Sequence, residues 1–200
     1  HIAVFLSSAP LFVALGAHFL LPEDRLTPLR GVGLLVAVVG IATLFSDDLL
    51  VQKQGLWRGD LLVMASACLW GTSTLFTKRF LASHMSSFRM LYVKVLVSTP
   101  LLLGISWWWE PDPFAQVTPL ALGLLLHQGL VIVFFSYLMW LVMLKRHRAS
   151  SVQSYTFLTP VWGVIGGIVM LGETFTPLMA AGMVLVGLGL LLINRPTRTP

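Results

Sequence analysis

The chain has 200 residues, of which 56% are hydrophobic and only 10% are charged. Soluble domains carry roughly a quarter charged residues, so most of this chain cannot face water, and the composition predicts an integral membrane protein. The formal net charge is +5, but most of the basic residues lie in alternate loops, which indicates contact with membrane lipid and not with nucleic acid.

The uncharged stretches predict seven membrane spans. A helix needs about 20 mostly apolar residues to cross the hydrocarbon layer. Because lipid offers backbone groups no hydrogen-bond partners, we expect every span to be a helix. The alternating pattern of a transmembrane β-strand is absent from the sequence. In chain order, the predicted spans cover residues 2–21, 28–46, 60–80, 88–109, 119–142, 150–171 and 177–194.

The loop charges predict the topology. Nine Lys and Arg residues lie in the loops 22–30, 79–89 and 143–149 and in the tail after residue 194, whereas the other loops together hold only Lys53 and Arg58. The positive-inside rule therefore places the C-terminus of a multi-pass protein in the cytoplasm, and we expect the cell (inner) membrane as its location. The run Trp107–Trp109 then lies at the outer interface, where indoles prefer to sit.

The sequence contains two copies of a two-helix hairpin. Pro10, Gly16 and Glu23 recur with the same spacing as Pro160, Gly166 and Glu173. After one extra residue in the first copy, Thr27-Pro28-Leu29, Gly33 and Gly40 recur as Thr176-Pro177-Leu178, Gly182 and Gly189. Corresponding helices are five spans apart, and an odd offset inverts them in the membrane. Inverted repeats of this kind are the architecture of many secondary transporters.

Several of these residues also carry a family resemblance. Gly59-Asp60-Leu61-Leu62 opens a span that has Leu69-Trp70-Gly71 in its middle and Lys78-Arg79 at its end; further on come Pro160, Gly172-Glu173, Thr176-Pro177, Gly182 and Gly189. This pattern resembles the EamA branch of the drug/metabolite transporter (DMT) superfamily. The resemblance implies ten helices in two inverted five-helix repeats and secondary transport of small metabolites such as amino acids, nucleosides or organic cations, commonly outward. It implies no enzymatic activity.

The repeat and the resemblance together predict the domain organisation. Three spans precede the second hairpin, none precedes the first, and the chain opens on His1 within an apolar run, so we expect three helices to be missing at the N-terminus. Residues 1–46 would then be the last two helices of the first repeat. Residues 47–59 would be a linker, 60–194 the complete second repeat, and 195–200 a basic cytoplasmic tail.

Each hairpin carries a glutamate whose position needs a reason, because a carboxylate just after a helix opposes the helix dipole. Glu23 and Glu173 are each followed by Thr-Pro, in which Thr27 or Thr176 can cap the next helix and Pro28 or Pro177 can take its first position. The glutamate can accept hydrogen bonds from that helix and close the hairpin. Proton coupling by these glutamates is the less favoured alternative, since both lie at the membrane edge.

One polar and aromatic stripe runs along the third span. At about 100° per residue, Ser66, Trp70, Ser73 and Thr77 fall on one face. They are candidates for the substrate pathway, because an indole offers both a flat apolar surface and a donor. Hydrogen bonding of these hydroxyls to neighbouring helices is an equally weighted alternative.

The fifth span holds His127, the best candidate for proton coupling because its unperturbed pKa is near 6.5. A neutral histidine bonded to a neighbouring helix is the favoured alternative. Gln128, Ser136 and Trp140 are pathway candidates, and α-helical geometry would put His127 about 180° from Ser136. Lys94, in the fourth span, is interpreted mainly as a membrane anchor.

The sixth span contributes Gln153 and Thr156 as further pathway candidates. They share one face with Pro160, Gly163 and Gly167, and we expect the two glycines to serve close helix packing. The single cysteine, Cys68, offers neither a disulfide nor a metal site. No metal cluster, cofactor motif or phosphate loop is evident in the sequence, so no cofactor is expected.

These observations favour a secondary carrier that alternates access between its two repeats. We expect its partners to be membrane lipid, a small-molecule substrate and, as an open alternative, protons; a homodimer is also left open. A channel or a noncatalytic assembly subunit is the main alternative function, and an intramembrane enzyme is the least favoured.

Overall fold

The computed structural model describes residues 7–46, 57–109, 118–172 and 174–195. These residues form helices and connecting turns, with no strand among them. Five helical segments are long and apolar enough to cross a membrane, namely Arg58–Leu81, Ser87–Trp109, Pro119–Arg146, Ala149–Leu171 and Pro177–Asn194. Two shorter apolar helices, Ala9–Leu20 and Pro28–Leu44, precede them in the chain. The predicted all-α integral membrane fold is confirmed.

The helices follow the predicted spans closely, with irregular turns inserted. The first part of the chain forms α2 (Ala9–Leu20), the 3-10 turn η1 (Pro22–Asp24), α3 (Pro28–Leu44), α5 (Trp57–Phe76) and the π-helix η2 (Thr77–Leu81). Then come α6 (Ser87–Trp109), α7 (Pro119–His127), the π-helix η3 (Gln128–Ser136) and α8 (Tyr137–Arg146). The last part forms α9 (Ala149–Ser154), the 3-10 turn η4 (Tyr155–Phe157), α10 (Leu158–Gly166), the π-helix η5 (Gly167–Leu171) and α11 (Pro177–Asn194).

The first helix differs from its predicted span. The prediction began at residue 2, whereas α2 begins at Ala9 after a turn at Ser7 and Ser8, and residues 1–6 lie outside the described residues. Pro10 stands in the first turn of α2, where its missing N–H costs nothing because the first amides of a helix have no partner in that helix. The start of the helix is therefore set by Ser8-Ala9-Pro10.

Three helices begin with Thr-Pro, and two of the three threonines cap. The Thr118 hydroxyl accepts from the Ala121 N–H at 3.1 Å, and the Thr176 hydroxyl accepts from the Met179 N–H at 3.2 Å. Thr27 makes no such side-chain bond, and its hydroxyl oxygen is buried without a hydrogen-bond partner in the described part of the chain. The turn before α3 is thus built differently from the turns before α7 and α11.

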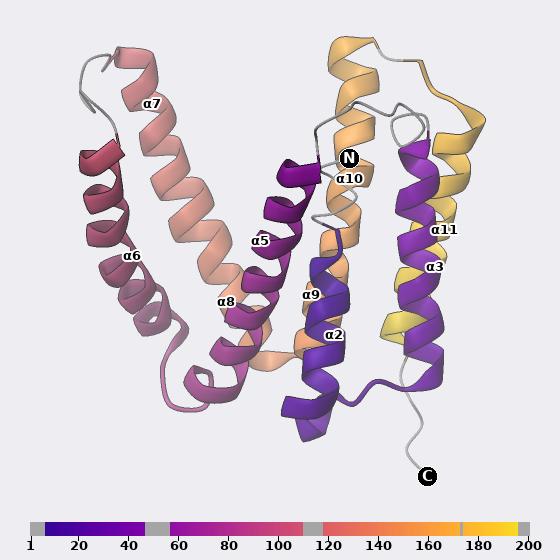
Figure 1. Ribbon diagram of the computed structural model, residues 1–200, viewed down its shortest axis with the longest axis horizontal. Helices are drawn as coiled ribbons and strands as arrows, with labels where there is room; N and C mark the ends of the chain where they lie inside the picture. Colours follow the sequence, from indigo (N-terminus) through magenta and orange to yellow (C-terminus); the bar gives the residue numbers. More distant parts are fainter. Residues whose placement is uncertain (1–6, 47–56, 110–117, 173, 196–200) are drawn as a thin grey trace. The chain divides into compact units, whose positions relative to one another are not determined.

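The contacts divide the chain into two units, one formed by His1–Arg79 with Arg148–Pro200 and the other by Phe80–His147. In the first unit, α3 and α11 run side by side (Figure 1). Their shared core includes Ala37, Ile41, Val186 and Ile193, all at most 1% exposed. On the other side of this core, α2 packs against α5 and α9.

Four glycines allow the backbones of α3 and α11 to touch. A Cβ atom on Gly40 would lie 2.7 Å from the Val186 nitrogen and 2.9 Å from the Gly182 oxygen. A Cβ on Gly189 would lie 2.7 Å from both the Ala37 nitrogen and the Gly33 oxygen. These are backbone atoms that cannot turn aside, so any side chain at these positions would force the helices apart.

The contact has the symmetry of the sequence repeat. Adding 149 to a residue number converts Gly33 to Gly182 and Gly40 to Gly189, as the two hairpins correspond in sequence. A Cβ on Gly33 would meet the Gly189 oxygen and the Ile193 nitrogen, and a Cβ on Gly182 would meet the Gly40 oxygen and the Leu44 nitrogen. Each contact therefore becomes the other when the two copies are exchanged, as it would across a two-fold axis between antiparallel helices.

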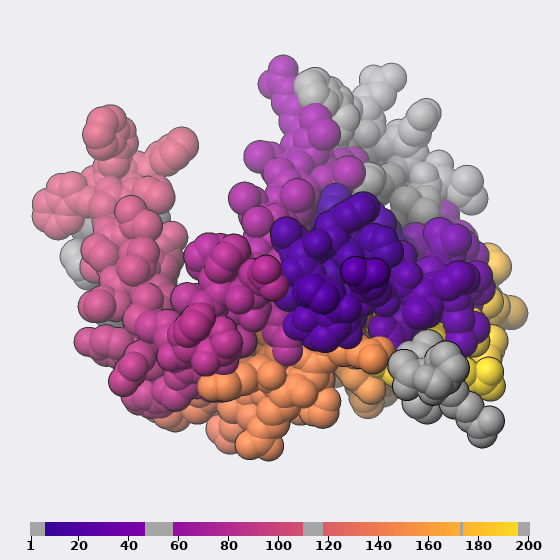
Figure 2. Space-filling view, turned by 90° about the horizontal axis from the view of Figure 1, so that it is seen from below, coloured from indigo at the N-terminus to yellow at the C-terminus, as the bar shows by residue number. Residues whose placement is uncertain are grey.

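The second unit is the pair formed by α6 and the continuous α7–η3–α8 helix. Met90, Leu91 and Leu141 form its small core, and the Lys145 ammonium donates to the Met85 carbonyl at 2.8 Å at one end. Most of the other side chains are exposed, as Figure 2 shows for the rose-coloured end of α6, where bulky side chains stand apart from one another. Trp107, Trp108 and Trp109 are 78%, 91% and 82% exposed.

Substitution of the contact glycines tests the α3–α11 packing. Gly40→Ala and Gly189→Ala should each destabilise the protein by about 1–3 kcal/mol, because the added methyl group meets backbone atoms. Gly31→Ala on α3 and Gly187→Ala on α11 are matched controls, since a Cβ atom there meets nothing within 4 Å. Thermal unfolding of the full-length protein in detergent measures the difference. Equal unfolding temperatures for the contact and control variants would contradict the proposed packing.

Candidate functional site

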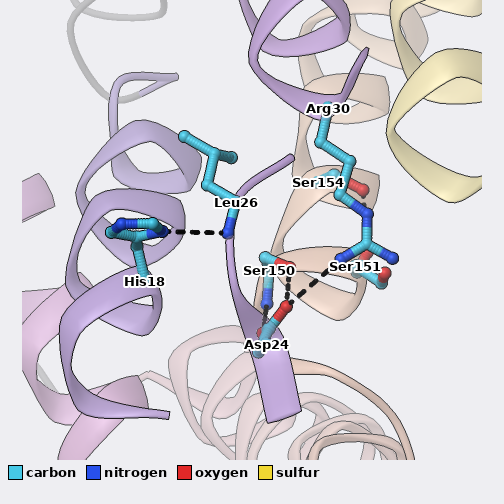
Figure 3. A network of polar contacts seen from close by, with 7 residues as sticks. All are labelled: His18, Asp24, Leu26, Arg30, Ser150, Ser151 and Ser154. Carbon is cyan, nitrogen blue, oxygen red and sulfur yellow. Dashed lines mark hydrogen bonds and ion pairs between the residues drawn. The ribbon is translucent and has the colours of Figure 1, made fainter. Parts of the chain in front are cut away.

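The most deeply buried acidic group among the described residues is Asp24, in the η1 turn between α2 and α3. Asp24 is 1% exposed. Its Oδ2 accepts the Ser150 backbone N–H at 2.8 Å, and its Oδ1 accepts the Ser150 hydroxyl (Figure 3). Because Ala149 and Ser150 are the first residues of α9, the carboxylate caps that helix from a segment 126 positions earlier in the chain. A carboxylate is favourable here, where unpaired N–H groups and the helix dipole are positive.

Arg30 completes the charge pairing of this acid. It lies in the first turn of α3, is 5% exposed, and its Nη1 is 3.8 Å from Asp24 Oδ1. A cation in the first turn of a helix opposes the helix dipole, and a buried charge is costly unless it is paired. Lys78, near the end of the α5–η2 helix, adds a further electrostatic attraction to Glu23 and Asp24. We refer to Asp24, Arg30 and Ser150 as the polar cluster.

The hairpin is closed by residues other than the predicted glutamate. Glu23 is exposed, whereas the Leu26 N–H donates to His18 Nδ1 at 3.2 Å across the turn (Figure 3). The next residue, Asp24, does accept helix N–H groups, but those of α9 and not those of α3. The expectation that Glu23 bonds to the following helix is therefore not met. Glu173 lies outside the described residues.

Gln153 lies one turn beyond the polar cluster on α9 and is completely buried. Its exposure is 0%, and neither Oε1 nor Nε2 has a hydrogen-bond partner in the described part of the chain. The same holds for Arg30 Nε and Thr27 Oγ1. Each such group costs about 1–3 kcal/mol when it is buried without a partner. Beside them, Asn194 Nδ2 donates to the Ser154 hydroxyl at 3.3 Å, so α11 also contacts this polar region.

The structure also bears on Thr156 and on the glycine face that was predicted for the sixth span. The Thr156 hydroxyl donates to the Gln153 carbonyl at 2.7 Å, within its own segment. The 3-10 turn η4 separates α9 from α10 at this point, so the residues beyond it do not continue the assumed α-helical face. Pro160 is buried, but a Cβ on Gly163 would meet nothing within 4 Å. The expected close packing at Gly163 is not found in the described structure.

The predicted stripe on α5 is only partly exposed. Ser66, Trp70 and Ser73 are exposed, whereas Thr77 is 1% exposed. Ser66 donates to the Leu62 carbonyl at 2.9 Å and Thr77 donates to the Ser73 carbonyl at 2.6 Å. The alternative expectation, bonding of these hydroxyls to neighbouring helices, is wrong for Ser66 and Thr77, because a hydroxyl on a helix can satisfy itself on the preceding turn.

The helix of the fifth span changes from α to π geometry between His127 and Gln128. The π-helix η3 begins at Gln128, immediately after His127, and ends at Ser136, whose hydroxyl donates to the Val131 carbonyl at 2.9 Å. A π turn holds about one residue more than an α turn, so each such turn shifts later residues by about 100° relative to α-helical geometry. The prediction that His127 and Ser136 face opposite directions assumed an uninterrupted α-helix, which η3 replaces between these two residues. His127, Gln128 and Ser136 are exposed and Trp140 is half-buried.

The sequence does not predict the polar cluster, because Asp24 and Ser150 pair across 126 positions of the chain. Asp24 directly follows Glu23, and Arg30 is one of the basic residues in the loop 22–30. One signal was present in the sequence. Asp24 and Arg30 occupy positions that hold Thr174 and Met179 in the second copy of the hairpin, so the charges are specific to the first copy.

These features define an all-α, multi-pass membrane protein with a symmetric helix contact and a buried charge cluster. Residues 57–195 match the EamA-like transporter family, and the chain belongs to that family. It is 26% identical over 190 residues to the "Uncharacterized transporter YoaV" of Bacillus subtilis, covering 95% of this chain and 64% of the relative. It is 28% identical over 185 residues to the "Probable amino-acid metabolite efflux pump" of Salmonella typhimurium, covering 89% of this chain and 61% of that protein.

The fold also occurs in a solved crystal structure, with a TM-score of 0.82 at 18% sequence identity. That alignment covers 100% of this chain and 67% of the solved chain. The family and the names of these relatives are those of transporters. The chain spans less than two thirds of the length of YoaV and of the efflux pump.

Removal of the Asp24 charge tests the polar cluster. Asp24→Asn leaves Arg30 buried without its carboxylate and should destabilise the protein by about 3 kcal/mol. Ser150→Ala, which removes only a hydroxyl group, should cost about 1 kcal/mol. Glu23→Gln is the control for charge at the adjacent exposed position and should change the stability by less than about 0.5 kcal/mol. Thermal unfolding in detergent distinguishes the three, and an Asp24→Asn protein as stable as Glu23→Gln would disprove the role of the cluster.

Proposed function

We propose that the full-length protein is a secondary-active carrier that exports small metabolites across the cell (inner) membrane by alternating access. Membership of the EamA-like transporter family supports transport, and the name of the Salmonella relative supports export. The proposed substrates are small metabolites such as amino acids, nucleosides or organic cations. The proposed topology has the C-terminus in the cytoplasm, as the distribution of Lys and Arg favours.

The observation that carries this proposal is the symmetry of the α3–α11 contact. Gly33 and Gly40 of α3 contact α11, and Gly182 and Gly189 of α11 contact α3. Exchanging the two hairpins converts one set of contacts into the other. Two inverted repeats that meet on such an axis can exchange their conformations, which opens a central site first to one side and then to the other. A close glycine contact suits this role, because the helices touch without long side chains that would have to repack.

The polar cluster supports an asymmetric form of this mechanism. Asp24 and Arg30 connect the α2–α3 turn to the start of α9, whereas the corresponding positions in the second hairpin hold the uncharged Thr174 and Met179. We therefore propose that the cluster closes one end of the carrier and separates when that end opens. Gln153, buried in the present arrangement, would then reach the substrate pathway and find the hydrogen-bond partners that it lacks here.

The other residues that the sequence predicts for the substrate pathway are part of this proposal. Ser66, Trp70 and Ser73 on α5, and Gln128, Ser136 and Trp140 around η3, are proposed to line the route. Proton coupling through His127 is a further proposal, which is supported by its position beside a π-helix, a feature common at functional sites.

Exchange transport distinguishes the carrier from its alternatives. The full-length protein, reconstituted in proteoliposomes loaded with unlabelled leucine, adenosine or tetraethylammonium, should accumulate the matching labelled compound transiently by counterflow for at least one of the three. This uptake should saturate and should exceed that of protein-free vesicles. A channel would instead give non-saturating flux without counterflow, and an assembly subunit would give none. Either of these results would contradict the proposed carrier, and repetition with an imposed pH gradient reports on proton coupling.

A further inference from the structure

His18, in the last turn of α2, closes the α2–α3 turn in one protonation state only. The Leu26 N–H donates to His18 Nδ1 at 3.2 Å. A backbone N–H can only donate, so Nδ1 must carry a lone pair, and the proton of the neutral ring must sit on Nε2. An imidazolium ring carries a proton on both nitrogens and accepts no hydrogen bond. This bond therefore exists only while His18 is neutral.

The bond ties the end of the turn to α2. The 3-10 turn itself is closed by the Asp24 N–H, which donates to the Leu21 carbonyl at 2.9 Å. Beyond it, the Leu26 side chain packs against the core of the first unit. In the described part of the chain, no other hydrogen bond joins residues 25–27 to α2. Loss of the His18 bond would therefore release the main chain between Asp24 and α3 from α2.

The same short stretch of main chain holds the acid of the polar cluster. Asp24 is separated from Leu26 by a single residue, and its carboxylate accepts the Ser150 N–H and pairs with Arg30. Figure 3 shows the His18–Leu26 bond and the contacts of Asp24 along this stretch. A shift of the main chain at Leu26 must therefore be taken up close to Asp24, whose two carboxylate oxygens both contact Ser150.

The turn and the elements packed against α2 bring several charged groups to this end. Helix α2 packs against α5, α9 and η1. Arg58 and Asp60 lie at the opposite end of α5. The charged groups at the near end are Glu23, Asp24 and Arg25 of the turn, Lys78 and Arg79 of η2, Arg148 before α9 and Arg30 of α3. Among these residue types and histidine, histidine is the one whose charge ordinarily changes between pH 5 and 8. A fall in pH through this range therefore acts on the turn through His18.

The second hairpin has no counterpart of this bond. By the correspondence of the two copies, His18 and Leu26 match Ile168 and Phe175. An isoleucine side chain offers no acceptor to a backbone N–H. The histidine thus belongs to the same copy of the hairpin as Asp24 and Arg30, and any pH response of this kind is confined to one end of the pair.

We infer that the α2–α3 turn is a pH-sensitive latch. Neutral His18 accepts from Leu26 and holds the turn against α2. A proton on Nδ1 makes two donors face each other, so the turn detaches, Asp24 loses its support and the polar cluster opens more readily. The bond favours the neutral ring, so its contribution is present at neutral pH and is lost as the pH falls.

The role of the latch in transport rests on the proposed function, in which the polar cluster closes one end of the carrier. In the proposed topology the loop 22–30 is cytoplasmic. Acidification of the cytoplasm would then favour the state that is open to that side. The proton acts here as a regulator at the end of the carrier, and its binding group is His18 and not His127.

Hydrogen exchange of the Leu26 amide tests the latch directly. The exchange rate is measured in the full-length protein in detergent at about pH 7.5 and about pH 5.5, and each rate is divided by the intrinsic rate of an unfolded amide at the same pH. Protection should fall about two- to tenfold at the lower pH, because one hydrogen bond is lost. His18→Asn places Oδ1 where Nδ1 lies and cannot be protonated, so it should keep the protection at both pH values.

Two variants complete this comparison. His18→Leu cannot accept and should show the low protection at both pH values. His84→Asn replaces an exposed histidine of the second unit and should respond to pH as the unaltered protein does. All variants are first compared by gel filtration, so that misfolding is recognised.

A cysteine at position 153 reports whether the latch controls the polar cluster. Gln153 is 0% exposed, so Gln153→Cys, combined with Cys68→Ser, should react slowly with a water-soluble maleimide at neutral pH. Its rate is divided by that of the unfolded protein at the same pH, because the thiolate is the reactive form. This ratio should rise severalfold at the lower pH. It should stay low with His18→Asn and be high at both pH values with His18→Leu.

The outcomes separate this inference from the proposed function. Protection of Leu26 that is independent of pH, or a pH response that persists in His18→Asn, would overturn the latch. Protection that changes while the reactivity at position 153 does not would overturn the coupling to the polar cluster. Neither measurement involves transport, so the carrier would still stand if counterflow were seen. If both measurements respond as expected but no compound shows counterflow, the latch stands and the carrier mechanism fails.

Discussion

The first unit depends on the close backbone contact between α3 and α11. In a membrane, helices gain little from burying apolar side chains, because the lipid is equally apolar, so close contact of small residues becomes the main source of specific packing. Gly33, Gly40, Gly182 and Gly189 provide this contact, and all four would place a Cβ within 2.9 Å of backbone atoms. The α2–α3 turn leads directly into α3, and α9 contacts α11, so each of the two segments that pair in the polar cluster adjoins a helix of this contact.

The polar cluster breaks the symmetry that the glycines establish. The hairpins match at the proline, the glycines and the Thr-Pro sequence, but only the first has Asp24 and Arg30. Two inverted repeats with identical ends would favour neither side of the membrane. In the proposed alternating-access carrier, a charge cluster at one end would give the two conformations different energies, since separation of Asp24 from Arg30 and Ser150 would expose or isolate charged groups. Under that proposal, the asymmetry would give the carrier a preferred resting state.

The fold could be predicted from the sequence because the membrane imposes strong rules. Span length, loop charges and Thr-Pro starts depend only on local residues, and the repeat revealed which glycines correspond. The partners of Asp24 could not be predicted, since Ser150 is 126 positions away. The facing of side chains on the fifth and sixth spans also could not be predicted, because η3, η4 and η5 depart from the assumed α-helical turn. Thr27 precedes α3 as predicted but does not cap it. A Thr-Pro sequence at the start of a helix therefore does not ensure the capping hydrogen bond.

The most direct test of this account is a reversible cross-link across the polar cluster. Asp24→Cys and Ser150→Cys are combined with Cys68→Ser in the full-length protein, which is then reconstituted, and counterflow is measured after oxidation and again after reduction. The account predicts that the disulfide forms readily and stops exchange, and that reduction restores it, whereas the single-cysteine variants respond to neither treatment. A cross-linked protein that exchanges substrate as fast as its reduced form, or a cysteine pair that does not cross-link, would contradict the claim that this end closes and opens during transport.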